Sequence, residues 1–184
     1  MKNIIKILIF FSLINYCYAD QMNLIQLKLS TLGGINADTD DFDYYSDDRF
    51  KKYDMSFDET YSARIIYSGL FVSAKHSTTN VGAKTPDAIV ESVAVGLASA
   101  SDEYRLDYFN AYVIAGVGVG AGRFTFKQPY LNDWEAMVEI NLEGGIELSD
   151  HLLLGVGCDY LHFGTPGETK AEQGELYMSI GLRF

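Results

Sequence analysis

Residues 134–148 alternate between apolar and polar side chains with a period of two, and this pattern restricts what the segment can form. Apolar or small residues occupy the even positions from Trp134 to Leu148, and glutamates occupy positions 135, 139, 143 and 147. Successive side chains of a strand point to opposite faces, whereas a helix would scatter both sets around its circumference. The segment is therefore predicted to be a β-strand with one apolar and one polar face.

The same alternation recurs along the rest of the chain. It is clear at residues 152–160 and 175–184, and weaker at 25–30, 61–68, 70–75, 89–98 and 109–120. Ser68-Gly69 and Ser149-Asp150 are tight-turn signals between neighbouring segments. The chain is thus predicted to contain eight strands.

The predicted connections alternate in length. Longer polar stretches follow the first, third, fifth and seventh strands, at residues 33–59, 78–87, about 127–133 and 164–173. Shorter ones follow the others, at residues 68–69, about 100–107 and 149–150. Barrels of the outer membrane have short periplasmic turns and longer extracellular loops. We therefore expect an all-β fold, an eight-stranded antiparallel up-and-down transmembrane β-barrel.

The polar strand faces carry charges of both signs and many glycines. The charged residues are Lys28, Arg64, Lys75, Glu139, Glu143, Asp159, Glu175 and Arg183. Inside a narrow barrel these charges can pair, which offsets their loss of water, and glycines leave room for long side chains. In a soluble sandwich, the alternative, glycines on a solvent face would weaken the strands without gain. The pattern favours apolar side chains facing lipid and a polar network in the lumen.

The first 19 residues have the features of a secretory signal. Lys2 and Lys6 precede an apolar run from Ile7 to Ile14, and Cys17 and Ala19 place small residues before a cut at Asp20. We expect a signal peptide at 1–19, a barrel domain at 20–184 and location in the outer membrane. Cys158 is then the one cysteine left, so no internal disulfide is expected. The net charge of −11 argues against a nucleic-acid partner.

Three segments resemble a known family. Ala111–Phe124, with its glycine alternation, resembles a strand of small outer-membrane barrels of the opacity-protein and outer-membrane-protein-A membrane-domain type. Residues 144–164 look like the penultimate hairpin of that group, and the chain's last strand is similar to its C-terminal assembly signal. The resemblance implies that the barrel-assembly machinery recognises Leu176, Met178, Ile180, Leu182 and Phe184. Members of the group include adhesins, small pores and structural proteins.

Residues 33–59, expected as a long first extracellular loop, are rich in carboxylates and aromatic side chains. Dense carboxylates could chelate Ca²⁺, but the glycine and terminal glutamate of an EF-hand loop are missing. A solvated surface loop is favoured. Aromatic residues are enriched in interfaces, which makes this loop a candidate contact for an extracellular protein or host-surface ligand. The candidate contact residues are Phe42, Tyr44, Tyr45, Phe50 and Tyr53.

These observations favour a non-enzymatic structural or adhesin-like protein with a largely salt-bridged lumen. A small diffusion channel is the alternative, because rings of acidic side chains select cations. A lipid A-modifying enzyme is the second alternative, on a partial match of His76, Ser77 and Glu91. No catalytic, cofactor-binding or metal residue is assigned, and the expected partners include outer-membrane lipid and lipopolysaccharide.

Overall fold

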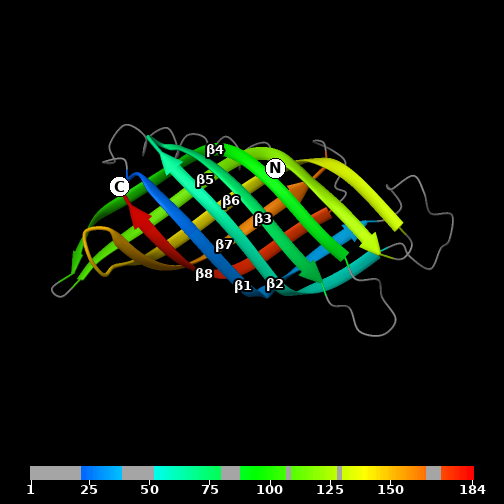
Figure 1. The fold of residues 1–184 in the computed structure, drawn as a ribbon, viewed down its shortest axis with the longest axis horizontal. Helices are drawn as coiled ribbons and strands as arrows, with labels where there is room; N and C mark the ends of the chain where they lie inside the picture. Colours follow the sequence, from blue (N-terminus) through cyan, green and yellow to red (C-terminus); the bar gives the residue numbers. More distant parts are fainter. Residues whose placement is uncertain (1–21, 39–51, 80–87, 107–108, 128–129, 165–170) are drawn as a thin grey trace, which may run out of the picture.

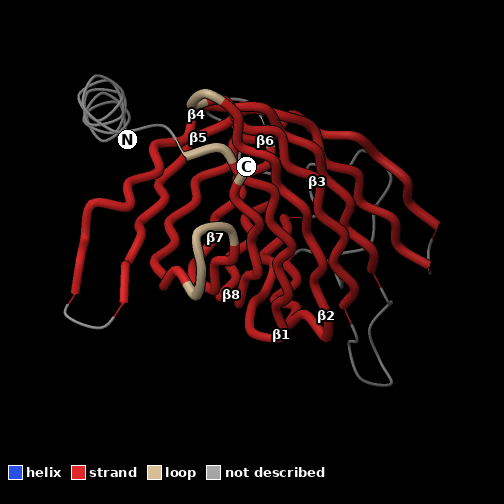
Figure 2. The backbone as a smooth tube through the Cα atoms, turned by 60° about the vertical axis from the view of Figure 1, so that its left-hand side comes forward, coloured by secondary structure: helices blue, strands red, loops and turns tan. Residues whose placement is uncertain are grey.

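Eight long strands form the wall of a closed barrel in the computed structural model (Figures 1 and 2). The structure describes residues 22–38, 52–79, 88–106, 109–127, 130–164 and 171–184. The strands are β1 (Leu24–Asp38), β2 (Lys52–Tyr67), β3 (Leu70–Thr79), β4 (Ala88–Leu106), β5 (Phe109–Lys127), β6 (Tyr130–Glu147), β7 (Leu152–Phe163) and β8 (Ala171–Arg183). Within the described residues no helix is long and apolar enough to cross a membrane.

Each strand pairs antiparallel with the next, and β8 pairs with β1 to close the wall. Closure leaves no strand edge without hydrogen-bond partners. Leu24 of β1 and Arg183 of β8 are paired at one end of the barrel, here called the terminal end. Asp38 and Lys52 are paired at the other, here called the loop end. The predicted eight-stranded antiparallel barrel is confirmed.

Two tight turns lie where the sequence predicts them. Between β2 and β3, Ser68 and Gly69 both have positive φ, 52° and 77°. Two-residue hairpins with this geometry match the right-handed twist of the flanking strands. Between β6 and β7, the Leu148 N–H donates to the Leu152 carbonyl at 2.9 Å, and the loop includes Ser149 and Asp150.

The strands are longer than predicted, which corrects five loop assignments. β3 reaches Thr79 and β8 begins at Ala171, so the loops assigned to 78–87 and 164–173 are too long. Residues 34–38 pair with 52–56, so the loop assigned to 33–59 is too long at both ends. β4 continues to Leu106, although the sequence suggests a connection at 100–107. β5 and β6 pair as far as Lys127 and Tyr130, so the connection expected at 127–133 is short. Backbone pairing continues into stretches where residues typical of loops, such as Gly, Asn, Asp and Ser, stand among the apolar residues that mark a strand.

The barrel has an apolar outer face and a polar inner face. Leu27, Val156 and Met178 point outward and are 60, 65 and 69 % exposed. Arg64 and Glu143 point inward and are each 1 % exposed. A soluble barrel has the opposite polarity, with apolar side chains inside and polar ones outside.

Glycines on the inner face of β4 and β5 make space for aromatic rings from other strands. A Cβ at Gly118 would lie 2.6 Å from Cζ of Phe71, and one at Gly122 would collide with the ring of Phe163. Phe163 also packs edge-to-face on Phe124, with ring centroids 4.7 Å apart. The inward glycines are therefore required by close packing across the lumen.

Candidate functional site

Glu143 of β6 is the centre of the largest hydrogen-bond cluster among the described residues of the lumen. Its Oε1 accepts from Gln26 at 2.6 Å, from Tyr112 at 2.8 Å and from Ser179 at 2.8 Å. Its Oε2 accepts from Arg64 at 3.0 Å and from Tyr177 at 2.9 Å. The donors come from β1, β2, β5 and β8, so one carboxylate connects five strands across the barrel.

Arg64 of β2 is held by three different acceptors. Its guanidinium donates to Oε1 of Gln26, to Oδ1 of Asn141 at 2.6 Å and to Glu143. Its side chain has no exposed area. A buried charge is tolerable only when its donors find partners, and these three acceptors meet that condition.

A second ionic cluster joins β1, β3, β7 and β8. Asp159 pairs with Lys28 at 3.1 Å and with Lys75 at 2.9 Å, and Lys75 also pairs with Glu175. The Lys28 ammonium lies 4.1 Å from the centroid of the Tyr177 ring. Because Tyr177 also donates to Glu143, it connects the two clusters.

Glu139 differs from the other lumen carboxylates because no cation pairs with it among the described residues. Its Oε2 accepts from Ser73 at 2.6 Å, and its Oε1 has no partner there. The buried charged side chains described are three cations and four carboxylates. The cations are Lys28, Arg64 and Lys75, and the carboxylates are Glu139, Glu143, Asp159 and Glu175. Among these described side chains there is therefore one more carboxylate than cations.

Apolar side chains lie above and below the polar clusters. Inward positions along β7 are Leu153, Gly155, Gly157, Asp159, Leu161 and Phe163, so the charge lies between apolar ends. Leu24, Ile66 and Ile114 are buried with Leu153 toward the terminal end, and Val90, Phe124 and Met137 with Phe163 toward the loop end. The charged clusters thus lie between an apolar layer at the terminal end and a layer of mixed apolar and uncharged polar side chains at the loop end, where Thr60, Ser77 and Gln173 are also buried.

The structure places seven of the eight predicted lumen residues in the buried interior, and Arg183 apart from them. Arg183 pairs with Glu147 at 3.0 Å at the terminal end, and a third of its side chain is exposed. Four of the five candidate contact residues, Phe42, Tyr44, Tyr45 and Phe50, lie outside the described residues. The backbone of Tyr53 pairs with Ala37 in the β1–β2 ladder.

The residues expected to form the assembly signal all have side chains on the outer face of the barrel, along β8 and directly after it. They are Leu176, Met178, Ile180, Leu182 and Phe184, each about half exposed or more. Their shared face results from the period of two along β8.

Sequence analysis missed the uncharged members of the network. These residues are Gln26, Tyr112, Asn141 and Tyr177, which are buried and hydrogen-bonded to charged groups, whereas the charge pattern of the sequence points only to charged residues. The sequence does indicate that each of them points inward, because each occupies an inward-facing position in the alternation of its strand. Which partners they would contact depends on strand pairing around the whole barrel.

The structure separates the residues suggested for a lipid A-modifying enzyme. His76 points outward and its Nδ1 lies 3.5 Å from Oε1 of Glu91. Ser77 points into the lumen, where it bonds Thr60 at 3.0 Å and Gln173 at 3.1 Å. The imidazole and the hydroxyl therefore lie on opposite faces of β3. In the described part of the chain, no three His, Cys, Asp or Glu side chains are placed to hold a metal ion.

A polar row crosses four strands on the outer face near the loop end. The ladders place His76 beside Glu91, Glu91 beside Arg123 and Arg123 beside Trp134. Arg123 donates to Glu91 at 2.9 Å, and its guanidinium lies 5.6 Å from the centroid of the Trp134 ring. We refer to these four residues as the outer polar row.

Comparison with known proteins identifies the fold. No family model and no curated protein sequence matches the chain. The crystal structure of Neisserial surface protein A is similar with a TM-score of 0.55 and 12% identity, over 88% of this chain and 97% of that one. OprG from Pseudomonas aeruginosa gives a TM-score of 0.48 at 11% identity, over 90% and 98% of the two chains. The chain has the fold of the small eight-stranded outer-membrane β-barrels.

Proposed function

We propose that the chain is an integral outer-membrane protein with a structural or surface-interaction role and no enzymatic activity. The single observation that carries this proposal is the inverted polarity of the barrel. An outer wall of exposed Leu, Val, Ile and Met is costly in water and stable against acyl chains. Charged side chains, in turn, lie inside the barrel, where they can pair.

The outer polar row is consistent with a membrane–water boundary near the loop end of the barrel. A charged side chain on the lipid face costs ~2–4 kcal/mol at the midplane but only ~0–1 kcal/mol near the interfaces. The row lies toward the loop end of its strands and contains Trp134. Aromatic and charged groups at this level match the membrane–water boundary.

We further propose that the lumen is closed. Ion pairs connect facing walls in the middle of the barrel, and apolar side chains pack above and below them. An eight-stranded barrel has an interior just wide enough for side chains to fill. With the lumen closed, interactions with other molecules take place on the outside of the barrel.

The proposed partners follow from this placement. Lipid and lipopolysaccharide would cover the outer wall, and the barrel-assembly machinery would bind the segment ending at Phe184. An extracellular protein or host-surface ligand would bind at the loop end, where the aromatic-rich residues 39–51 join β1 to β2. Export by a signal peptide at 1–19 belongs to the same proposal.

Two measurements test location and closure together. The protein folded into phospholipid vesicles should migrate differently on a gel before and after boiling, because a closed barrel stays folded in detergent. In a planar bilayer it should give no steady current. Failure to insert would contradict the membrane location, and a steady current would contradict the closed lumen.

A small diffusion channel is the second candidate, and a specific observation favours it. Buried polar atoms in the lumen lack partners among the described residues: Ser62 Oγ, Glu139 Oε1, Asn141 Nδ2, Gln173 Oε1 and Glu175 Oε2. Buried polar atoms usually bond to water when no protein group is near. A connected file of water would conduct ions, and a steady current that falls in Glu139→Gln would establish this function.

A further inference from the structure

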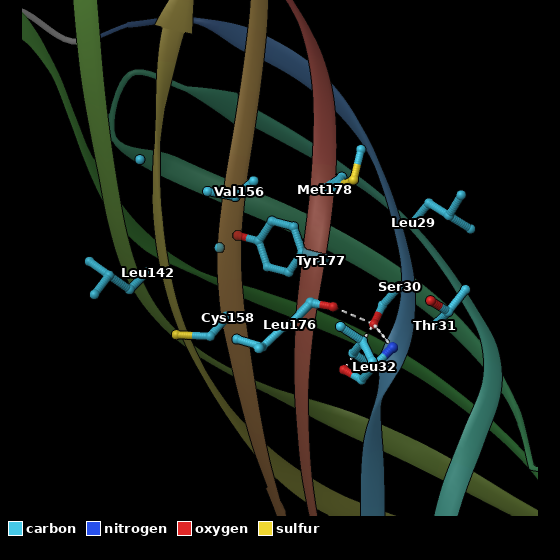
Figure 3. A pocket seen from close by; sticks show the side chains of 12 residues that line it. Leu29, Ser30, Thr31, Leu32, Leu142, Val156, Cys158, Leu176, Tyr177 and Met178 are labelled. Carbon is cyan, nitrogen blue, oxygen red and sulfur yellow. Dashed lines mark hydrogen bonds between the residues drawn. The ribbon is translucent and has the colours of Figure 1, made fainter.

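A groove crosses the outer wall where β6, β7, β8 and β1 lie side by side (Figure 3). Its volume is about 590 Å³, which is within the ~300–1,000 Å³ of ordinary ligand sites. Outward side chains of Leu142, Val156, Leu176 and Met178 line it, and no charged side chain does. Its walls therefore continue the apolar outer face of the barrel.

The hollow in the groove results from Gly144 of β6. The ladders place Gly144 beside Val156, Val156 beside Met178 and Met178 beside Leu29. Gly144 therefore leaves one end of this outward row without a side chain. A Cβ there would lie 3.9 Å from the Tyr112 carbonyl oxygen, the nearest atom. A larger side chain can thus be added at Gly144 without a clash at its Cβ.

The opposite wall is raised by a β-bulge in β1. Leu29 pairs with Met178 and Leu32 with Leu176, so β1 has one residue more than β8 in this interval. Thr31 and Leu32 are consequently both exposed on the outer face. Ser30, buried beneath them, donates to the Leu176 carbonyl at 2.5 Å and accepts from the Leu32 N–H at 3.2 Å (Figure 3). These bonds satisfy polar groups that the bulge would otherwise leave facing lipid.

The shape of the groove selects its occupant. The barrel wall is broad, so the wall of a second copy would span the groove and leave most of it unfilled. A single hydrocarbon chain is slender and flexible and can lie in it. Met178, 69 % exposed beside the groove, can adjust its unbranched side chain to such a ligand. At β6 the groove lies only a few residues from Glu147 at the terminal end, opposite the loop end where an extracellular ligand is proposed to bind.

We propose that this groove binds one acyl chain of a phospholipid, as a specific site within the lipid-facing wall. The inference rests on the proposed membrane location of the barrel. The bound acyl chain fills the hollow between Gly144 and the raised bulge at Leu32. Fluid lipid would otherwise cover this uneven surface poorly. Such a lipid exchanges more slowly than its neighbours around the barrel.

The test counts slowly moving lipids around the barrel. The full barrel is folded into phosphatidylcholine vesicles that contain a trace of phosphatidylcholine spin-labelled near the end of one chain. Electron paramagnetic resonance then gives the number of motionally restricted lipids per barrel. Gly144→Leu fills the groove and should lower that number by one. Gly174→Leu is the matched control, because a Cβ at this exposed glycine of β8 meets nothing within 4 Å and Gly174 does not line the groove.

A chemical modification tests the same site in the unsubstituted protein, so its result does not depend on whether a variant folds. Cys158 is exposed and lines the groove, so an alkyl methanethiosulfonate can fill it after the unsubstituted barrel has inserted. This reaction should also remove one restricted lipid. An unchanged number after both treatments, or an equal loss in Gly174→Leu, would overturn the proposed site. If no form of the protein inserts into the vesicles, the proposed membrane location fails instead.

Discussion

At the scale of single residues, the lumen is organised around a few buried charges whose partners come from distant parts of the chain. Glu143 accepts five hydrogen bonds, and Arg64 is fully enclosed. Breaking one side of a buried pair leaves an unpaired charge and costs ~3–5 kcal/mol, whereas apolar replacement of both sides is often neutral. The Arg64–Glu143 pair should show the large loss on breaking one side, but a smaller recovery on replacing both, because four further donors bond Glu143.

Glu143→Leu alone should lower the free energy of unfolding by ~3–5 kcal/mol, because Arg64 loses its carboxylate partner in the interior. The double change Arg64→Met with Glu143→Leu should recover part of that loss, because the buried Arg64 charge is gone but Gln26, Tyr112, Tyr177 and Ser179 still lack the carboxylate. Urea unfolding of the barrel in vesicles measures both values. Glu172→Gln is the control, since its ion pair with His162 is partly exposed and should contribute at most ~1 kcal/mol. Equal losses in the single and double variants would contradict a dominant role for charge pairing.

Gly118 tests the packing of rings against the β4–β5 wall. Gly118→Val would place its Cβ 2.6 Å from the Phe71 ring, and overpacking of this kind costs ~1–3 kcal/mol. Adding Phe71→Leu should return part of the loss. Urea unfolding provides the measurement, and Gly174→Val, at a position open on its outer side, should change stability little. A destabilisation by Gly174→Val as large as that by Gly118→Val would argue against ring packing as the cause.

At the scale of the element, alternation predicted the number of strands and the inward side of each. It did not predict the strand ends, because the apolar residues near Asp38 and Lys52 are few and stand among the glycine, asparagine, aspartate and serine residues typical of loops. Nor could it predict that Asp159 would meet both Lys28 and Lys75, which depends on the pairing register across several strands. Arg183 has the inward parity but lies too near the end of β8 to join the central clusters. The uncharged Gln26 and Asn141 carry no charge signal at all.

The β2–β3 turn offers a prediction at this scale. Ser68 has φ of 52°, which a residue with a Cβ adopts at a cost, and asparagine tolerates this region better. Ser68→Asn should therefore stabilise the barrel by a few tenths of a kcal/mol, whereas Gly69→Val should destabilise it by ~1–2 kcal/mol. Unfolding in urea would show the two opposite shifts. The same sign for both would indicate that the backbone conformation of this turn does not limit stability.

At the scale of the whole molecule, the polarity of the two faces explains the other features. Closure of the eight strands satisfies the backbone, so an apolar outer wall can face hydrocarbon without unpaired N–H or C=O groups. The same closure encloses the charges, which then pair across the lumen. Inward glycines, the ion pairs and the outer polar row near the loop end are each consistent with this arrangement.

The most direct measurement is labelling by a carbene-generating photoprobe dissolved in the lipid of vesicles that contain the folded barrel, with the labelled residues identified by mass spectrometry. Outward Leu154, Val156 and Ile180 should carry the label, whereas buried Lys28, Arg64 and Glu139 should not. Labelling of the three buried polar residues with sparing of the three apolar ones would show that hydrocarbon lies on the other side of the wall and would contradict the account.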